Sequence, residues 1–200
     1  MPRSFVIEQG RRAYLRAPRP SDSDEFLRLA RASRELHRPW VYAPETAREF
    51  AAYLSRCGNT SERCFLVCRR NDDALAGVYN VSQIARGFFE SAYLGYYAFA
   101  PTAGEGLMAE GLQLVLRHCF RRLKLHRLEA NIQPGNAASI ALAKGAGFRL
   151  EGFSPRYLKI DGHWRDHERY AIVAEDRARE KEEARRRGPL QVHRNDPDHP

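Results

Sequence analysis

Two glycines stand between a β-rich run and a long apolar stripe, in the segment Ala103-Gly104-Glu105-Gly106-Leu107-Met108. The first turn of a helix leaves several backbone N–H groups without partners, and the helix dipole favours negative charge at that end. Glycines at such a junction let an anion approach the backbone closely. The pattern therefore predicts a binding site for a pyrophosphate group.

Three kinds of loop share this chemistry. A Walker loop needs Lys followed by Ser or Thr after its glycine, and Leu107 follows Gly106, which excludes that loop. A dinucleotide-binding loop matches Gly104-x-Gly106-x-x-Ala109, with Glu129 about 20 residues further on. The remaining chain has too few strand–helix units for a doubly wound sheet, which argues against this loop. A glycine-rich turn without any ligand is the third interpretation.

The sequence offers little for metal or thiol chemistry. Its cysteines form no Cys-x-x-Cys pair, and we expect all of them to be reduced and structural: Cys57, Cys64, Cys68 and Cys119. Two histidines, His163 and His167, follow the turn signal Asp161-Gly162, so they would lie on a hairpin and share no helix face. We predict no metal site.

Apolar periodicity predicts the elements that hold the loop in place. Strands are expected over residues 6–16, 64–69, 75–84, 91–99 and 127–133, and near 148–153, 157–160 and 168–173. Helices are expected over residues 24–36, 47–57, 108–123 and 137–144. The loop at residues 103–108 thus lies between a strand and the longest helix.

The chain has 200 residues, a hydrophobic fraction of 43% and a formal net charge of +8, which suits one domain with anionic partners. We expect this domain to span residues 1–174. Residues 175–200 carry charges that sum to zero and are expected to form a helical, then disordered, extension. No apolar run reaches the roughly 18 residues of a membrane span, and no signal-peptide core is present, so we expect a cytoplasmic protein without membrane contact.

Several motifs together resemble the GNAT N-acetyltransferases and, within them, the RimJ/RimL-type group that acetylates the N-terminal residue of ribosomal proteins. They are Tyr96-Tyr97-Ala98-Phe99, the glycine loop with Glu110, His126-Arg127-Leu128-Glu129-Ala130-Asn131, Asn136-x-x-Ser139, Gly147-Phe148 with Glu151-Gly152, and the run from Tyr157 to His167. The resemblance covers roughly residues 10–173. It implies an α+β fold: a mixed, mostly antiparallel sheet whose central strands splay apart, with helices on both faces.

The resemblance also implies acetyl-CoA as the acetyl donor. Backbone amides near Tyr97, Ala98 and Phe99 would face the thioester and pantetheine, and Asn136 would contact the pantetheine arm. The pyrophosphate would lie on the loop residues Gly104, Glu105, Gly106, Leu107 and Met108. The chain departs from many relatives, which have Arg or Gln in place of Ala103 and a basic or neutral residue in place of Glu105. These two departures predict weaker cofactor binding, by roughly 1 kcal/mol.

The catalytic groups are less clearly marked. Where other GNAT enzymes have a tyrosine that protonates the leaving thiolate, this chain has Ala143, so Ser139 is the candidate acid; its alternative role is to cap or line a helix. Glu90 is the first candidate for the base and Glu129 the second, and either can be an ordinary surface carboxylate. The acceptor wall is expected from the loop with His37, Arg38 and Trp40, unless Trp40 packs inward.

An α-amino group has a pKa near 8, so about a tenth is already neutral at pH 7, whereas a lysine amine near 10.4 needs much more help. The N-terminal α-amine of a protein, such as a ribosomal protein, is therefore the predicted acceptor. Two alternatives remain: a small-molecule amine, and a non-catalytic module that binds RNA or the ribosome. Neither a nucleic-acid partner nor a particular assembly, monomer or homodimer, is required by the enzymatic interpretation.

Overall fold

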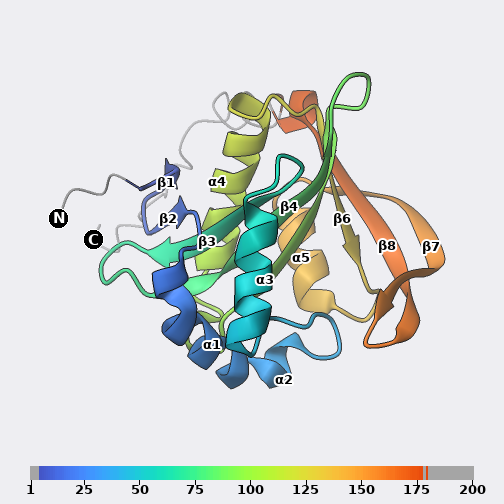
Figure 1. The fold of residues 1–200 in the computed structure, drawn as a ribbon. Helices are drawn as coiled ribbons and strands as arrows, with labels where there is room; N and C mark the ends of the chain where they lie inside the picture. Colours follow the sequence, from blue (N-terminus) through green and yellow to red (C-terminus); the bar gives the residue numbers. More distant parts are fainter. Residues whose placement is uncertain (1–4, 178, 180–200) are drawn as a thin grey trace, which may run out of the picture.

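The computed structural model describes residues 5–177 and 179, and its centre is one eight-stranded sheet (Figure 1). The strands lie in the order β1-β2-β3-β4-β5-β6-β8-β7, and every neighbouring pair is antiparallel except β5 and β6, which run parallel. Their bounds are β1 Glu8–Gln9, β2 Ala13–Arg16, β3 Arg63–Arg69, β4 Leu75–Ala85, β5 Ser91–Ala98, β6 Arg127–Ile132, β7 Arg149–Ile160 and β8 His163–Val173.

Helices cover both faces of this sheet and divide the core in two. In Figure 1, α3 lies in front of the sheet and α4 behind it. The apolar side chains of α4 and α5 pack on one face, and those of α1 and α3 pack on the other. The helices are α1 Ser23–Ala32, α2 Arg34–His37, α3 Ala47–Cys57, α4 Leu107–Arg121 and α5 Ala137–Gly145, with short 3-10 turns at Pro20–Asp22 and Ala100–Thr102. The α+β architecture with helices on both faces is as predicted.

The central parallel pair separates soon after it begins. Strands β5 and β6 pair over only three positions, the last of which joins Tyr93 to Glu129. Beyond that point β5 continues to Ala98 along β4, and β6 continues to Ile132 along β8. The backbone edges of β5 and β6 therefore diverge into a gap, which confirms the predicted splay.

Most elements begin and end close to the predicted residues, with two differences. The expected helix over residues 24–36 is interrupted at Ser33, whose hydroxyl donates to the carbonyl of Leu29 at 2.7 Å. The expected strands at 148–153 and 157–160 are one strand, β7, with an irregular register between Ser154 and Leu158. Only residues 175–177 and 179 of the expected extension over 175–200 are described, and they are helical; the rest of it lies outside the described residues.

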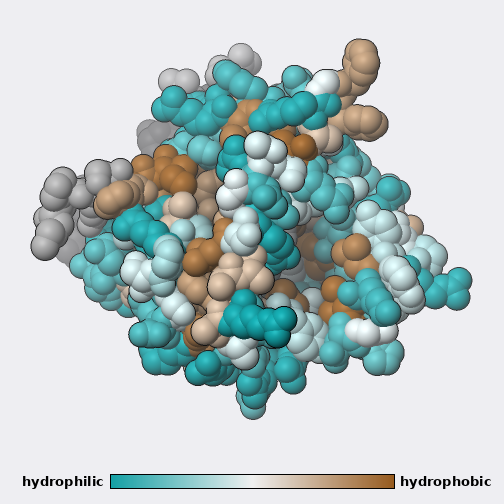
Figure 2. Space-filling model, viewed as in Figure 1, coloured by the Kyte–Doolittle hydropathy of each residue, from teal (hydrophilic) through white to brown (hydrophobic). Residues whose placement is uncertain are grey.

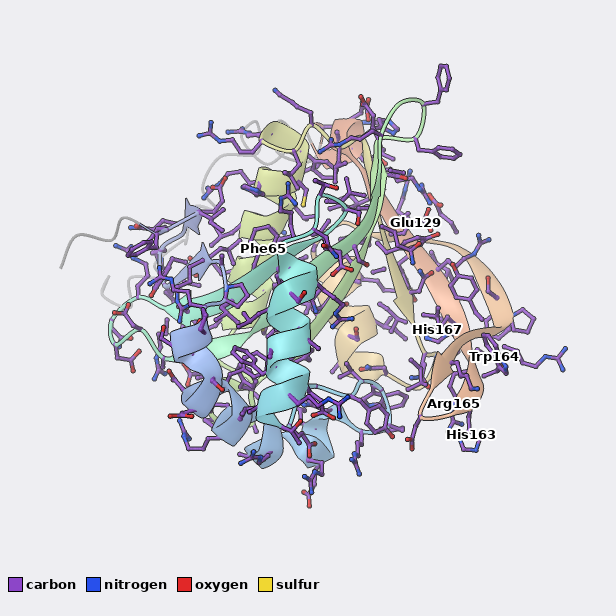
Figure 3. The ribbon with its side chains drawn as sticks, in the orientation of Figure 1. Phe65, Glu129, His163, Trp164, Arg165 and His167 are labelled. Atoms are coloured by element: carbon purple, nitrogen blue, oxygen red, sulfur yellow. A yellow bond between two sulfur atoms is a disulfide. The ribbon has the colours of Figure 1, made fainter. Side chains whose placement is uncertain are left out.

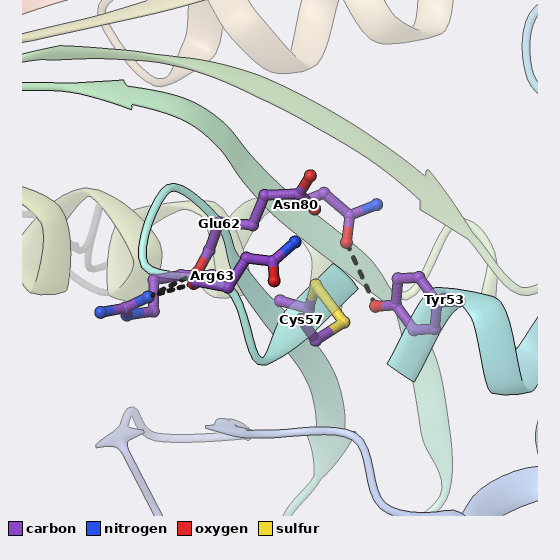
Figure 4. The surroundings of a disulfide bond; sticks show 7 residues. Tyr53, Cys57, Glu62, Arg63 and Asn80 are labelled. Atoms are coloured by element: carbon purple, nitrogen blue, oxygen red, sulfur yellow. Dashed lines mark hydrogen bonds between the residues drawn. A yellow bond between two sulfur atoms is a disulfide. The ribbon is translucent and has the colours of Figure 1, made fainter. Parts of the chain in front are cut away.

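The cysteines are not all reduced. Cys57, at the end of α3, forms a disulfide with Cys64 near the start of β3, and their Cα atoms are 5.3 Å apart (Figure 4). A short connection returns the chain from the helix to the sheet, which brings two cysteines separated by seven residues together. The prediction was therefore wrong for this pair. Cys68 and Cys119 are free and buried, as expected.

Candidate functional site

The glycine loop opens α4 in the way that its sequence predicts. Gly104 and Gly106 have φ values of +82° and +77°, a conformation that favours residues without a Cβ. The helix begins at Leu107, and no side chain among the described residues caps it. Its first backbone bond runs from the N–H of Glu110 to the carbonyl of Gly106, at 3.1 Å. The N–H groups of the first turn are consequently available to an anion.

The N-terminal hairpin β1–β2 braces the same helix. The Oε1 atom of Glu110 accepts from the N–H groups of Arg12, at 2.9 Å, and Ala13, at 3.4 Å. A Cβ at Gly10 would lie 2.1 Å from this oxygen, so the contact requires glycine there. Two turns further along α4, Arg117 forms an ion pair with Glu8 at 2.6 Å. Sequence reasoning did not predict this bracing.

Two arginines change the expected electrostatics of the loop. Arg69, at the end of β3, donates to both carboxylate oxygens of Glu105 at 2.9 and 3.0 Å, and it also pairs with Asp72. The negative charge at Glu105 is therefore partly compensated, because the same guanidinium also pairs with Asp72. Arg12 lies beside the loop, because its Nη1 atom is 3.9 Å from the position that a Cβ at Gly106 would take. These cations come from distant strands, which is why the local sequence did not reveal them.

A cavity of about 340 Å³ opens between α4 and α5, directly after the glycine loop. Small side chains line it, together with Glu110 and Gln113; they are Ala109, Ala141, Gly145 and Ala146, beside Leu142. Small residues keep two helices from filling the space between them. A long ligand that binds the start of α4 through its phosphates could extend into this cavity.

On the side of the gap, β5 presents the backbone of Ala98 and not that of its neighbours. The N–H of Phe99 donates to the carbonyl of Ala76 on β4 at 2.8 Å. Because backbone groups alternate in direction along a strand, those of Tyr97 also face β4, and those of Tyr96 and Ala98 face the gap. The backbone N–H groups of Tyr97 and Phe99 therefore face β4, and only that of Ala98 within the expected set faces the gap. The side chains of Tyr97 and Phe99 pack against α1 and α3.

Ser139 meets a tyrosine that was quoted only as part of the motif. The Ser139 hydroxyl donates to the hydroxyl of Tyr96 at 2.8 Å, and that hydroxyl donates to the carbonyl of Ser139 at 3.0 Å. Burial raises the pKa of Tyr96 to about 12, so the phenol keeps its proton at neutral pH. The cap of α5 is Asn136, whose Oδ1 accepts from the N–H of Ser139 at 3.1 Å. The Ser139 hydroxyl is therefore not needed as the helix cap.

The two candidate bases lie at the same end of this region, where β5 and β6 are paired. Glu90 is exposed in the connection before β5, eight residues from Ala98, a separation of about 26 Å along an extended strand. Glu90 lies three residues before the gap opens at Tyr93, further from Ala98 than Glu129 is, and we therefore prefer Glu129 as the base. Glu129 lies where the β5–β6 pairing ends, and its Oε1 accepts from Arg127 Nε at 3.0 Å. Figure 3 shows Glu129 on the upper part of β6.

The loop after α2 contributes differently from the expectation. His37 is buried, and its Nε2 atom is 2.8 Å from the carbonyl oxygen of Ala98; burial lowers its pKa, so the neutral ring serves as donor. It thus fixes β5 from inside the core and is not part of an exposed wall. Arg38 is exposed and stacks on Tyr42, with its guanidinium carbon 5.1 Å from the ring centre.

Trp40 is half-buried and lies against the turn that precedes α5. A Cβ at Gly135 would be 3.0 Å from the Trp40 ring, and Gln133 Nε2 donates to the carbonyl of Trp40 at 3.4 Å. The loop is therefore adjacent to Asn136. Figure 2 shows the surface hollowed between α3 and the β7–β8 hairpin, with apolar side chains inside.

The side chain of Asn131, on β6, has a buried Oδ1 atom without a partner among the described residues.

Within the described part of the chain, no group of three or more His, Cys, Asp or Glu side chains is placed to hold a metal ion. The same residues contain no helix with the length and apolar character of a membrane span.

The fold and the loop define a class of protein. Residues 12–149 match the family described as "Acetyltransferase (GNAT) domain". The chain belongs to this family and is an acetyl-CoA-dependent N-acetyltransferase.

Two relatives and one solved structure are similar to this chain. It is 32% identical over 176 residues to "Probable N-acetyltransferase YjcK" of Bacillus subtilis (strain 168), covering 84% of this chain and 97% of that protein. It is 40% identical over 106 residues to "[Ribosomal protein uS5]-alanine N-acetyltransferase" of Escherichia coli (strain K12), a match that covers 53% of this chain and 55% of that protein. Among solved structures, it resembles Mycobacterium smegmatis RimJ in complex with CoA-disulfide, with a TM-score of 0.75, 29% identity, and coverage of 86% of this chain and 90% of that one.

Proposed function

We propose that the protein transfers the acetyl group of acetyl-CoA to the α-amino group at the N-terminus of a protein, with a ribosomal protein as the acceptor. The observation that carries the proposal is the gap between β5 and β6, which has free helix-opening amides at one end and the Tyr96–Ser139 pair beside it. The likeness to a uS5-alanine acetyltransferase and to RimJ supports the choice of acceptor.

The described residues fit the donor. The pyrophosphate binds the N–H groups of Gly106, Leu107 and Met108, where both the dipole and the unpaired donors favour an anion. Arg12 adds positive charge beside the loop, Arg69 offsets the Glu105 carboxylate, and the cavity between α4 and α5 receives the nucleotide end. The pantetheine arm pairs with the backbone N–H of Ala98, whose carbonyl already accepts from His37, and with Asn136.

Acetyl-CoA supplies an activated acyl group, and the protein supplies orientation and proton transfers. Tyr96 positions the Ser139 hydroxyl, which donates to it. Ser139 Oγ gives the departing sulfur a proton once this hydrogen turns away from Tyr96, and the proton that Glu129 removes from the amine replaces it through solvent. Glu129 takes the proton of the incoming amine, directly or through one water. A backbone N–H on β5 that faces the gap stabilises negative charge on the carbonyl oxygen.

The acceptor enters from the hollowed face between α3 and the β7–β8 hairpin. Trp40 borders this entrance and offers an apolar surface to the first side chain of the acceptor. Arg38, on the same loop, is exposed beside Tyr42 and contributes positive charge to the rim. His37 acts as a positioning residue through Ala98.

The test is acetyl transfer to a panel of acceptors. Peptides that begin with Ala, Ser or Met are incubated with acetyl-CoA beside N-terminally blocked copies that retain a lysine, and beside spermidine and an aminoglycoside. Product on the free peptides alone supports the proposal. Product on the small amines and none on the peptides would assign a small-molecule acceptor instead. In both cases, mass spectrometry locates the acetyl group.

A further inference from the structure

The connection between β4 and β5 carries two aromatic side chains that are directed into solvent. Phe88 is 108% exposed and Phe89 is 74% exposed, the two highest values among the large exposed hydrophobic residues described. Figures 1 and 2 show this connection extending beyond the body of the molecule, with apolar side chains at its end. Isolated exposed apolar residues are common, but two adjacent phenyl rings on a projection indicate a contact surface.

The projection is held in place by the segment between α4 and β6. Arg86 Nη1 donates to the carbonyl of Leu123 at 2.5 Å. The carbonyl of Glu90 accepts from the N–H groups of His126, at 2.7 Å, and Arg127, at 3.2 Å. Hydrogen bonds on both sides of the two rings thus fix the base of the connection, which reduces the conformational entropy that binding would cost.

The bracing segment is basic. Arg121, Arg122 and Lys124 are exposed, and within the described part of the chain none of them forms an ion pair with a carboxylate. Arg86 is also exposed and binds only a backbone carbonyl. Against these four cations, the projection itself contributes a single carboxylate, Glu90. The two rings therefore stand beside a surface that carries more positive than negative charge: four cations against Glu90 and against Glu175, which pairs with His126.

We propose that this surface, the aromatic tip of Phe88 and Phe89 with its flanking cations, binds single-stranded RNA. Bases stack on exposed aromatic rings regardless of their identity, while nearby arginines and lysines bind the phosphates. The chemistry favours RNA over other partners. The cations suit a polyanion and the exposed flat rings suit unstacked bases; an anionic membrane is the alternative that the vesicle experiment tests.

The tip and the acyl-transfer site occupy opposite ends of β5. Phe89 precedes the strand, whereas Ala98 closes it, so bound RNA leaves the gap open to donor and acceptor. The aromatic tip thus tethers the enzyme to a partner that contains RNA while a protein N-terminus reaches the gap. The proposal does not depend on which amine is acetylated.

The experiment measures fluorescence anisotropy of a labelled 12-nucleotide single-stranded RNA against the full chain, over a series of salt concentrations. We expect Phe88→Ser combined with Phe89→Ser to weaken binding by about tenfold or more, because each stacked base contributes substantially. Phe88→Tyr with Phe89→Tyr, which keeps the rings, should retain binding. Arg121→Gln with Arg122→Gln should reduce the slope of log K against log salt by about 1.4, since each phosphate contact contributes about 0.7.

Matched controls remove similar groups elsewhere: Leu150→Ser with Phe153→Ser, which are about half exposed on β7, and Arg28→Gln with Arg48→Gln, which are exposed on α1 and α3. Both should leave RNA affinity unchanged. Absence of RNA binding by the wild type, or equal loss in the control variants, would overturn the proposal. So would binding to anionic phosphatidylcholine–phosphatidylglycerol vesicles that requires the phenylalanines while RNA binding does not.

Discussion

The hydroxyl groups of Tyr96 and Ser139 are 2.8 Å apart, and the tyrosine returns a second hydrogen bond to the backbone carbonyl of the same serine. The pair joins the free edge of β5 to the first turn of α5. A family tyrosine is absent where Ala143 lies, and that alanine is completely buried. A phenol therefore reaches this region from the strand and not from the helix.

Ser139→Ala should lower kcat by about 100-fold with little change in the dissociation constant of CoA, because a general acid contributes mainly in the transition state. Tyr96→Phe should lower kcat by about five- to tenfold, since it removes the orientation of Ser139 and leaves the acid in place. Steady-state kinetics with an N-terminal peptide checks both values.

The double variant separates a positioning role from a general loss of stability. If Tyr96 acts through Ser139, Tyr96→Phe should have almost no further effect in a Ser139→Ala background. Tyr53→Phe is the control, because its hydroxyl donates to Asn80 on the opposite face of the sheet. Full additivity of the two losses would contradict the positioning role.

Arg69 and Glu105 should control donor affinity as a pair. Arg69→Gln leaves the Glu105 carboxylate uncompensated beside the phosphate site and should raise the dissociation constant of CoA by about three- to tenfold at low salt. Glu105→Gln alone should not weaken binding, and adding it to Arg69→Gln should recover most of the loss. Isothermal titration calorimetry at two ionic strengths measures these values. Equal weakening by both single variants would refute the charge argument.

Gly104→Val should weaken CoA binding by about tenfold, because a β-branched residue at φ +82° costs roughly 1–2 kcal/mol and shifts the loop. No atom within 4 Å would obstruct a Cβ there, so the effect comes from the backbone conformation and not from a clash. The Gly58→Ala variant serves as the control, since that glycine has ordinary contacts and a negative φ. An unchanged dissociation constant would argue against the loop as the phosphate site.

Gly77→Ala should destabilise the fold by about 1–3 kcal/mol, because a Cβ would lie 2.4 Å from Met108 Sδ and 2.5 Å from the carbonyl oxygen of Tyr97. The flexible sulfur can move, but the strand backbone cannot. The free energy of unfolding from urea titration tests this value. A variant as stable as the wild type would mean that α4 does not pack closely on β4.

Acidification should destabilise the protein through His37. Burial lowers the pKa of this histidine, whereas the unfolded chain has a pKa of about 6.5, so the unfolded state takes up the proton more readily. Stability is therefore fully present above about pH 6.5 and is lost as the pH falls toward the lowered value. His118 and His167 change in the same direction because they too are buried.

His37→Gln keeps an N–H donor for Ala98 and removes the titration. Its free energy of unfolding should fall less than that of the wild type between pH 7.5 and 5.5, measured by urea titration at each pH. Identical pH dependence of the two proteins would exclude His37 as a contributor.

The fold was largely predictable because its signals are local. The apolar stripe of α4 and the hairpin turn at Asp161-Gly162, where both residues have positive φ, depend on neighbours in the sequence. The glycine loop is of the same kind. The resemblance to a family supplied the splay, which no local pattern predicts.

The parts that failed depend on distance in space. Glu90 and Glu129 are far apart in the sequence, and only the register of β5 against β6 shows that both lie at the paired end of these strands, with Glu129 at the start of the gap. The sequence predicts a loop position for His37, and only the structure shows its ring bonded to the carbonyl of Ala98. Arg12 and Arg69 lie beside the glycine loop but come from positions far away in the sequence. The disulfide between Cys57 and Cys64 joins the end of α3 to β3, which only the three-dimensional path of the chain reveals.

The contacts of Glu110 with Arg12 and Ala13 couple α4, the helix that we propose binds the donor, to the edge of the sheet. A protease cut near residue 10, a bulky fusion there, or any ligand that loosens β1 would release the first turn of α4 without touching the gap. Donor affinity would then report on the state of the amino-terminal hairpin, some hundred positions earlier in the chain.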